Sequence, residues 1–143
     1  MRLFTTRFGE LDVSEKEIIT FKDGILGLEN LTRYLILRPP ESQPLAWFQS
    51  TDKPEIALPV ISLQFINLNY ELDLDPKSEK DLELKRGGQL EAYFVVYLGK
   101  EHGSSQVNLA TPIVVNPASR LGKQVLQERK QQPSRFNLLE LLE

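Results

Sequence analysis

The chain has 143 residues, 41% of them hydrophobic and 26% charged, which is the composition of one ordinary globular domain. It has no cysteine, which excludes disulfides, cysteine-bound zinc and a cysteine nucleophile. The formal net charge of −3 argues against a general nucleic-acid binder. No apolar run approaches the ~18 residues of a membrane span, and the first residues have no signal-peptide core. We therefore expect a cytoplasmic protein with no membrane partner and no direct nucleic-acid partner.

Short apolar runs separated by turn residues dominate the first half of the chain. Ser14 and Glu17 have the spacing of a helix capping box, but β-branched and aromatic residues follow them and favour a strand. Gly24 lies in a turn where a positive φ is expected. The short link at residues 51–54 fits a hairpin between the two runs that flank it. The pattern predicts strands over residues 2–8, 11–13, 18–21, 33–38, 45–50 and 55–63.

The second half holds the clearest helix and the clearest strand. Asp75 and Pro76 suit an N-cap and a first helical position, so we predict a surface helix over residues 76–84. Residues 89–98, QLEAYFVVYL, have the strongest strand pattern and are expected to be central. Residues 137–143, NLLELLE, have the pattern of a short amphipathic helix. Further strands are predicted at 69–74, 107–111, 113–115 and 123–126.

About nine short strands with frequent glycine and proline turns indicate a mostly β protein. We predict a small antiparallel β-barrel or sandwich-like single domain over residues 1–130, with one short peripheral helix. Residues 131–143 are expected to be a C-terminal tail that contains the short NLLELLE helix.

Charge is unevenly distributed along the chain. The acidic segment, residues 71–83, holds six acidic and two basic residues, a local net charge of −4. Residues 120–136 hold five basic residues and one acidic residue, a local net charge of +4. Such patches suit protein recognition by complementary potential, but they also occur as ordinary solvated faces. The candidate binding residues from the acidic segment are Glu71, Asp73, Asp75 and Asp81.

The sequence offers little for catalysis. The single histidine, His102, has no partner at metal-ligand spacing, and no nucleophile motif or phosphate-binding glycine loop is present. Asp73 and Asp75 could share a cation, but isolated acidic pairs are common. Tyr93 and Tyr97 lie in an apolar run that is typical of a core and not of an RNA-stacking platform. We expect no enzyme activity, no cofactor and no metal.

Residues 107–126, VNLATPIVVNPASRLGKQVL, contain two strand patterns around an asparagine-proline corner. Gly122 can supply a positive φ where the chain turns back. Asn108 and Asn116 lie at the ends of strands. Such asparagines commonly satisfy nearby backbone groups, and contact with a partner is the alternative.

Three stretches of the sequence resemble one known family. They are F-K-D-G-I-L-G-L-E at residues 21–29, F-Q-S-T-D-K-P-E-I-A-L-P-V at residues 48–60, and N-L-A-T-P-I-V-V-N-P followed by G-K-Q-V-L within residues 108–126. Together they are similar to the flagellar assembly factor family, FliW. Leu28 and Leu58 stand where the family usually has phenylalanine, which changes packing detail only.

The resemblance implies a protein-binding regulator. Family members bind flagellin and antagonise CsrA, a translational repressor, which relieves repression of flagellin mRNA; their action on the repressor is described as allosteric. Two alternatives stay open: a holder of flagellin alone, or a small ligand-binding or enzymatic barrel with a carboxylate pair in a deep polar pocket. With the acidic residues above, the candidate protein-binding residues are Gln49, Ser50, Asn108 and Asn116.

Overall fold

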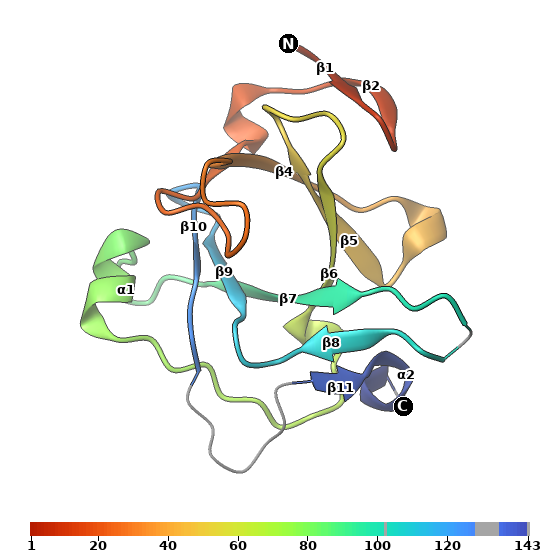
Figure 1. Ribbon diagram of the computed structural model, residues 1–143. Coiled ribbons are helices and arrows are strands. Elements are labelled where there is room, and N and C mark those ends of the chain that lie inside the picture. The colour runs from red at the N-terminus through yellow and green to blue at the C-terminus, as the bar shows by residue number, and fades with distance from the viewer. Residues whose placement is uncertain (102, 128–134, 143) are drawn as a thin grey trace.

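The computed structural model describes residues 1–101, 103–127 and 135–142, and within them strands dominate (Figure 1). The strands are β1 (Arg2–Thr5), β2 (Gly9–Asp12), β3 (Ile19–Thr20), β4 (Arg33–Leu37), β5 (Leu45–Ser50), β6 (Ala57–Ser62), β7 (Glu91–Tyr97), β8 (Gln106–Asn108), β9 (Ile113–Asn116), β10 (Leu121–Gln124) and β11 (Arg135–Asn137). The α-helices are α1 (Pro76–Asp81) and α2 (Leu138–Leu142). Single 3₁₀ turns cover Glu15–Glu17, Pro40–Ser42 and Leu63–Phe65.

Seven strands close into a barrel in the order β7, β6, β5, β4, β3, β10 and β9, because β9 also pairs with β7. β8 and β11 extend the sheet beyond β7, and β1 and β2 form a separate ribbon. The predicted mostly β barrel is therefore confirmed. The predicted antiparallel order holds between barrel neighbours except for β3 and β10, which run parallel with Leu121 opposite Thr20. A parallel pair needs a long connection, and here most of the barrel lies between the two strands.

An aromatic cluster fills the barrel. Phe21, Tyr34, Phe48 and Tyr93 are each at most 2% exposed. Ring centroids are 5.5 Å apart for Phe21 and Tyr34 and 5.2 Å apart for Phe48 and Tyr93, both pairs edge to face. Each such pair contributes about 0.5–1.5 kcal/mol beyond the burial of its apolar area. The inward positions follow the period of two in β4, β5 and β7.

Gly122 serves the barrel in a way that its sequence context did not predict. The positive φ of the β9–β10 turn falls on Arg120, at 58°. Gly122 lies instead against the ring of Phe21, and a Cβ at this position would overlap the ring. The glycine is needed for close approach of a side chain and not for a left-handed backbone.

A second apolar cluster lies on the other face of β7. Phe94 and Val96 point into it, and Leu141 of α2 closes it with 3% exposure. β11 pairs with β8, and the Asn67 N–H donates to the Leu141 carbonyl at 2.7 Å. Residues 135–142 of the predicted C-terminal tail therefore pack on the sheet as a strand and a short helix.

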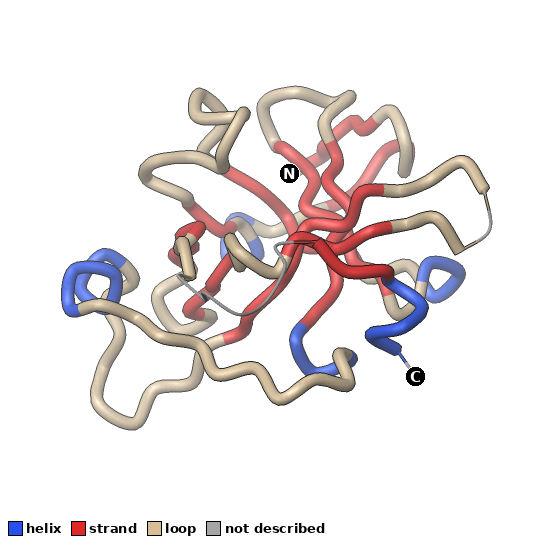
Figure 2. The backbone as a smooth tube through the Cα atoms, turned by 60° about the horizontal axis from the view of Figure 1, so that its bottom comes forward, coloured by secondary structure: helices blue, strands red, loops and turns tan. Residues whose placement is uncertain are grey.

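The strand expected at residues 69–74 does not form. Figure 2 shows this stretch as an irregular strap that crosses the outside of the strands on its way to α1. The side chain of Gln127 satisfies the backbone of Asp73: its Oε1 accepts from the Asp73 N–H at 2.9 Å and its Nε2 donates to the Asp73 carbonyl at 2.8 Å. The backbone groups that a strand partner would bond are thus satisfied by a side chain.

Two local predictions change at their boundaries. α1 ends at Asp81 and not at residue 84, since the bond from the Leu82 N–H to the Ser78 carbonyl is the last with i→i−4 spacing and Glu83 has φ of 52°. The capping box of Ser14 and Glu17 does form, but it caps a single 3₁₀ turn. The predicted strand follows immediately as β3.

Candidate protein-binding site

The three stretches that resemble the FliW family meet at one end of the barrel. They line a groove of about 330 Å³, which we call the motif groove. Its walls come from residues 25–28, residues 55–58, the ends of β7 and β8, and the side chains of Thr111 and Gln124. Residues almost 100 positions apart in the chain are therefore neighbours, because β3 and β10 pair and bring the loop after β3 onto the end of β10.

The loop after β3 places one apolar side chain inside the barrel and the next one outside. Ile25 is 2% exposed, whereas Leu26 is 75% exposed. Gly24, with φ of 69°, allows the turn, as expected. The Leu26 N–H donates to Gln124 Oε1 at 2.8 Å, and the Leu28 N–H donates to the Ile25 carbonyl at 2.6 Å. These hydrogen bonds fix the backbone of the loop, and the exposed side chain of Leu26 projects from it.

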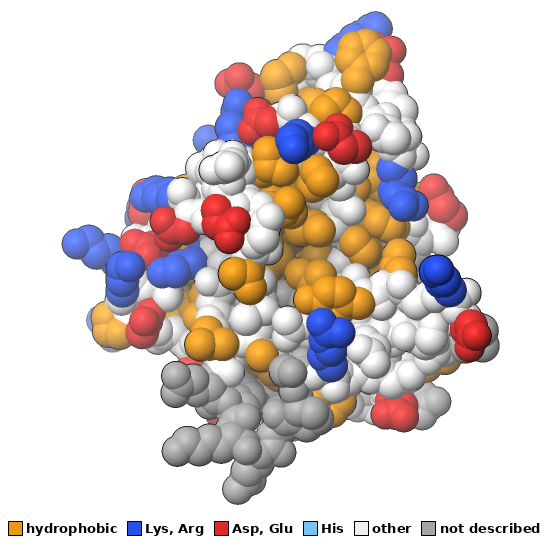
Figure 3. Space-filling model, viewed as in Figure 1, with side chains coloured by type: hydrophobic (Ala, Val, Ile, Leu, Met, Phe, Trp, Pro, Cys, Tyr) orange, Lys and Arg blue, Asp and Glu red, His pale blue; other side chains and the backbone are white. Residues whose placement is uncertain are grey.

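The floor of the motif groove is apolar. Leu58 and Val95 are half-buried, and Tyr97 is 41% exposed with the Arg135 guanidinium 4.4 Å from its ring centroid. Figure 3 shows a band of hydrophobic side chains down the middle of this face, with charged side chains on both sides. Exposed apolar bands with polar rims are typical of protein-binding surfaces.

The side chains of Gln49 and Ser50 have structural roles inside the fold. Both side chains are fully buried. Gln49 Nε2 donates to the carbonyls of Ser50 and Pro54, and Ser50 Oγ accepts from the N–H groups of Asp52 and Lys53. These bonds shape the β5–β6 hairpin, which in turn carries residues 55–58 to the motif groove. We therefore do not include either side chain in the proposed contact surface.

The two asparagines also satisfy backbone, but they differ in exposure. Asn116 is 3% exposed, donates to the Leu82 carbonyl at 2.9 Å and accepts from the Ala118 N–H at 3.1 Å. It therefore links β9 to the end of α1. Asn108 accepts from the Ala110 N–H and donates to Thr111 Oγ1, yet it is half-buried and lines the motif groove. Only Asn108 keeps surface that a partner could touch.

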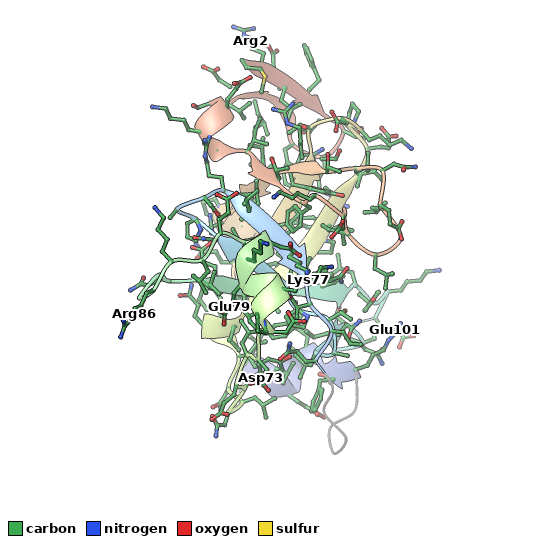
Figure 4. All side chains as sticks on the ribbon, turned by 90° about the vertical axis from the view of Figure 1, so that its left-hand side faces the viewer. Arg2, Asp73, Lys77, Glu79, Arg86 and Glu101 are labelled. Carbon is green, nitrogen blue, oxygen red and sulfur yellow. The ribbon has the colours of Figure 1, made fainter. Side chains whose placement is uncertain are left out.

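The acidic segment lies along one side of the molecule, around α1. Figure 4 looks onto this side and shows Asp73, Lys77 and Glu79 facing outward from the strap and α1. Glu71, Asp73, Asp75 and Glu79 are exposed, and Asp81 is half-buried. Asp75 Oδ1 accepts from the Ser78 N–H at 2.8 Å, and these hydrogen bonds with Ser78 lower the pKa of the Asp75 carboxyl.

The predicted acidic and basic segments partly neutralise each other. Lys123 Nζ lies 2.6 Å from Asp81 Oδ2, and this contact lowers the pKa of Asp81. Arg120 Nη1 donates to the Glu15 carbonyl at 3.1 Å. Arg129 and Lys130 lie outside the described residues. The charge left for a partner on the acidic side is therefore carried by the strap and the outer face of α1, not by Asp81.

Comparison with known proteins identifies the family that shares this architecture. A model of the family described as FliW protein matches residues 2–138. The chain belongs to the FliW family. A solved structure, a crystal structure of the flagellar assembly factor FliW, matches with a TM-score of 0.87 and 26% identity over 96% of each chain. The family expected from the three stretches is confirmed, and so is the mostly β fold expected from the strand pattern.

Several FliW relatives span nearly the same length. The flagellar assembly factor FliW of Caldicellulosiruptor saccharolyticus is 34% identical and covers 94% of this chain and 88% of its own. That of Geotalea uraniireducens is 32% identical and covers 100% of this chain and 87% of its own. That of Thermosipho africanus is 29% identical, with 96% and 95% covered. All three are named as flagellar assembly factors.

The converging carboxylate pair expected of a small enzymatic or ligand-binding barrel is not found in the hollow described next. A hollow of about 530 Å³ has Glu91 as the one carboxylate among the described residues that line it, so no carboxylate pair converges there. No group of three metal-ligating side chains occurs in the described parts of the chain. None of the helices described is long and apolar enough to cross a membrane. His102 lies outside the described residues.

Sequence reasoning missed the apolar half of the motif groove. Leu26, Leu58, Val95 and Tyr97 looked like ordinary strand or loop residues, because each is separated from the others by many positions. No sequence signal brings these residues together, because the β3–β10 pairing that makes the family stretches converge is visible only in the structure.

Proposed function

We propose that this FliW family member is a cytoplasmic, non-catalytic regulator that binds flagellin and antagonises a CsrA-type translational repressor. Release of the repressor from flagellin mRNA would match flagellin synthesis to assembly. The observation that supports this most is the motif groove, where three distant family stretches form one exposed apolar surface on a rigid barrel. A partner surface of this kind needs no catalytic group, cofactor or metal.

Flagellin is assigned to the motif groove. A subunit that will polymerise carries apolar contact surface that is unpaired before assembly. An amphipathic segment of such a subunit can lay its apolar face into a groove of this kind. Leu26 would be an anchor, since an exposed apolar side chain on a held loop loses little freedom when it is buried. Asn108 and Gln124 supply polar groups at the rim.

The repressor is assigned to the acidic segment. An RNA-binding protein carries lysine and arginine for phosphate contacts, so its surface complements exposed carboxylates. Asp73 and Glu79 are exposed on the side that Figure 4 shows, and Gln127 holds the strap there through the backbone of Asp73. None of these residues lines the motif groove, so the repressor and flagellin would occupy different surfaces.

A flagellin-only holder is the second candidate. The observation that favours it is the ion pair of Lys123 with Asp81, which already offsets part of the acidic charge. The two candidates agree on the motif groove and differ only in whether the repressor binds.

The flagellin assignment is tested with Leu26→Ser in a titration against purified flagellin. Its matched control is Leu126→Ser, because Leu126 is also a highly exposed leucine, at 65%, but does not line the motif groove. We expect Leu26→Ser to weaken flagellin binding at least about tenfold, the usual cost at an anchor, and Leu126→Ser to leave it unchanged. Equal effects of the two substitutions would remove flagellin from the motif groove.

A further inference from the structure

A second hollow lies at the other end of the barrel from the motif groove. Its volume is about 530 Å³, within the range of small-molecule sites. The chain segments at the end of β6 and the start of β7 line this hollow, whereas the start of β6 and the end of β7 line the motif groove. The two hollows are therefore distinct, and we call this one the basal hollow.

Most of the basal hollow is apolar. Leu45 and Leu63 contribute from β5 and the 3₁₀ turn after β6, and Leu72 reaches it from the strap. Phe65 lies on the same 3₁₀ turn and also lines the hollow. Its side chain is 46% exposed, which is unusual for a phenylalanine. A concave, mostly apolar wall with an exposed aromatic ring suits the hydrocarbon part of a ligand.

Three polar side chains join on one side of the basal hollow. Arg38 Nη2 donates to Tyr93 Oη at 2.6 Å, and Tyr93 Oη donates to Glu91 Oε1 at 3.0 Å. The nearest guanidinium-to-carboxylate approach, from Arg38 to Glu91, is 4.0 Å, which is too long for a direct hydrogen bond. Tyr93 thus separates the two charges and holds the arginine head in place.

Arg38 has hydrogen-bonding capacity to spare. A guanidinium has five N–H donors, and the bond to Tyr93 uses one of them. The planar fork of a guanidinium matches a carboxylate, which accepts two parallel bonds. Glu91 is already an acceptor for Tyr93, and its charge offsets that of Arg38 at long range. Attraction to an anion would therefore act at contact distance, through hydrogen bonds.

We propose that the basal hollow binds a small organic carboxylate with an apolar body. The carboxylate pairs with the free edge of Arg38, and the hydrocarbon part lies against the leucines and Phe65. This site is separate from the motif groove and meets the acidic segment only at Leu72, so it does not depend on the proposed function. A ligand of this kind would be a small metabolite.

Decanoate is a suitable probe, used below its micelle-forming concentration, with 1-decanol as the neutral analogue and decylammonium as the cationic one. Calorimetric titration of the full chain is expected to give saturable decanoate binding and at least about tenfold weaker binding of the other two, as hydrogen bonds to a charged head group are the stronger ones. Equal or tighter binding of either analogue, or decanoate binding that never saturates, would overturn the proposal.

Two substitutions locate the site. Arg38→Gln should lower decanoate affinity about tenfold, whereas Arg33→Gln, an exposed arginine on β4 outside the basal hollow, should not. Phe65→Ala removes an exposed ring and should also weaken binding, with thermal unfolding as the check that each variant is folded. An unchanged decanoate affinity in Arg38→Gln would contradict the assignment. So would a nuclear magnetic resonance titration with decanoate in which the chemical-shift changes are confined to the motif groove.

Discussion

The ammonium of Lys123 lies 2.6 Å from the carboxylate of Asp81 and joins β10 to the end of α1. The contact brings together two segments that the sequence presents as separate, opposite patches. Because Lys123 is also close to the loop after β3, the same side chain lines a smaller hollow with Lys22 and Asp23. The ion pair therefore stabilises the position of α1 and offsets part of the acidic charge.

Removal of this ion pair should give a pH-dependent loss of stability. Lys123 lowers the pKa of Asp81 below its ordinary 3.8, so the pair stabilises the fold above that pH and ceases to do so as the pH falls through the lowered pKa. Lys123→Met should lower the melting temperature at pH 7 and have a much smaller effect in strong acid. The measurement is thermal unfolding of both proteins across this range. A difference in melting temperature that is independent of pH would contradict the electrostatic account.

Asn116 provides a test between a structural role and a binding role. Asn116→Ala removes its 2.9 Å bond to the Leu82 carbonyl, which keeps a second donor in Ser119 Oγ at 2.8 Å, and a typical intramolecular hydrogen bond contributes about 0.5–1.5 kcal/mol. We expect that loss in the free energy of unfolding, measured by urea denaturation. Affinity for either protein partner should stay the same under conditions where the variant is folded. Full stability with lost partner binding would show that Asn116 is a contact residue.

Gly122→Ala should destabilise the barrel because the new methyl group would overlap the Phe21 ring. Overpacking of this kind costs about 1–3 kcal/mol. Phe21→Leu in the same chain should relieve the overlap, so the double variant should be more stable than the sum of the two single effects predicts. Denaturant unfolding of the four proteins measures this coupling. Strict additivity would mean that Gly122 matters for its backbone and not for the ring.

The acidic surface is tested by charge reversal at exposed positions. The double substitution Asp73→Lys with Glu79→Lys leaves two structural aspartates unchanged. Asp75 caps α1, and Asp81 pairs with Lys123. The double variant should weaken repressor binding and make the remaining binding less sensitive to salt. Its control, Glu41→Lys combined with Glu101→Lys, changes the net charge equally at exposed glutamates outside the acidic segment. Equal weakening by the control would show that only net charge matters.

The local sequence pattern was sufficient to predict much of the fold. The alternation in QLEAYFVVYL predicted β7, and the short link after Ser50 predicted the β5–β6 hairpin, since neighbouring residues alone determine these features. The parallel contact of Thr20 with Leu121 could not be predicted in this way. It joins positions a hundred residues apart, and each strand is too short to carry a signal for its partner.

The candidate site was less accessible to sequence than the fold. The pattern of residues 69–74 favoured a strand, but Gln127, 54 positions from Asp73, satisfies the strap backbone instead. Gln49 belongs to a family stretch, but it is buried and its side chain supports the β5–β6 hairpin. Exposed groove residues such as Leu26 become visible only when the barrel brings distant loops together.

The central claim, that this protein antagonises a CsrA-type repressor, is most directly tested by calorimetric titration with the repressor of the same organism at low and high salt. The account predicts saturable binding that weakens as salt rises, and loss of that binding in Asp73→Lys/Glu79→Lys. No binding at either salt concentration, with flagellin bound in a parallel titration, would contradict the regulatory half of the account and leave a flagellin holder.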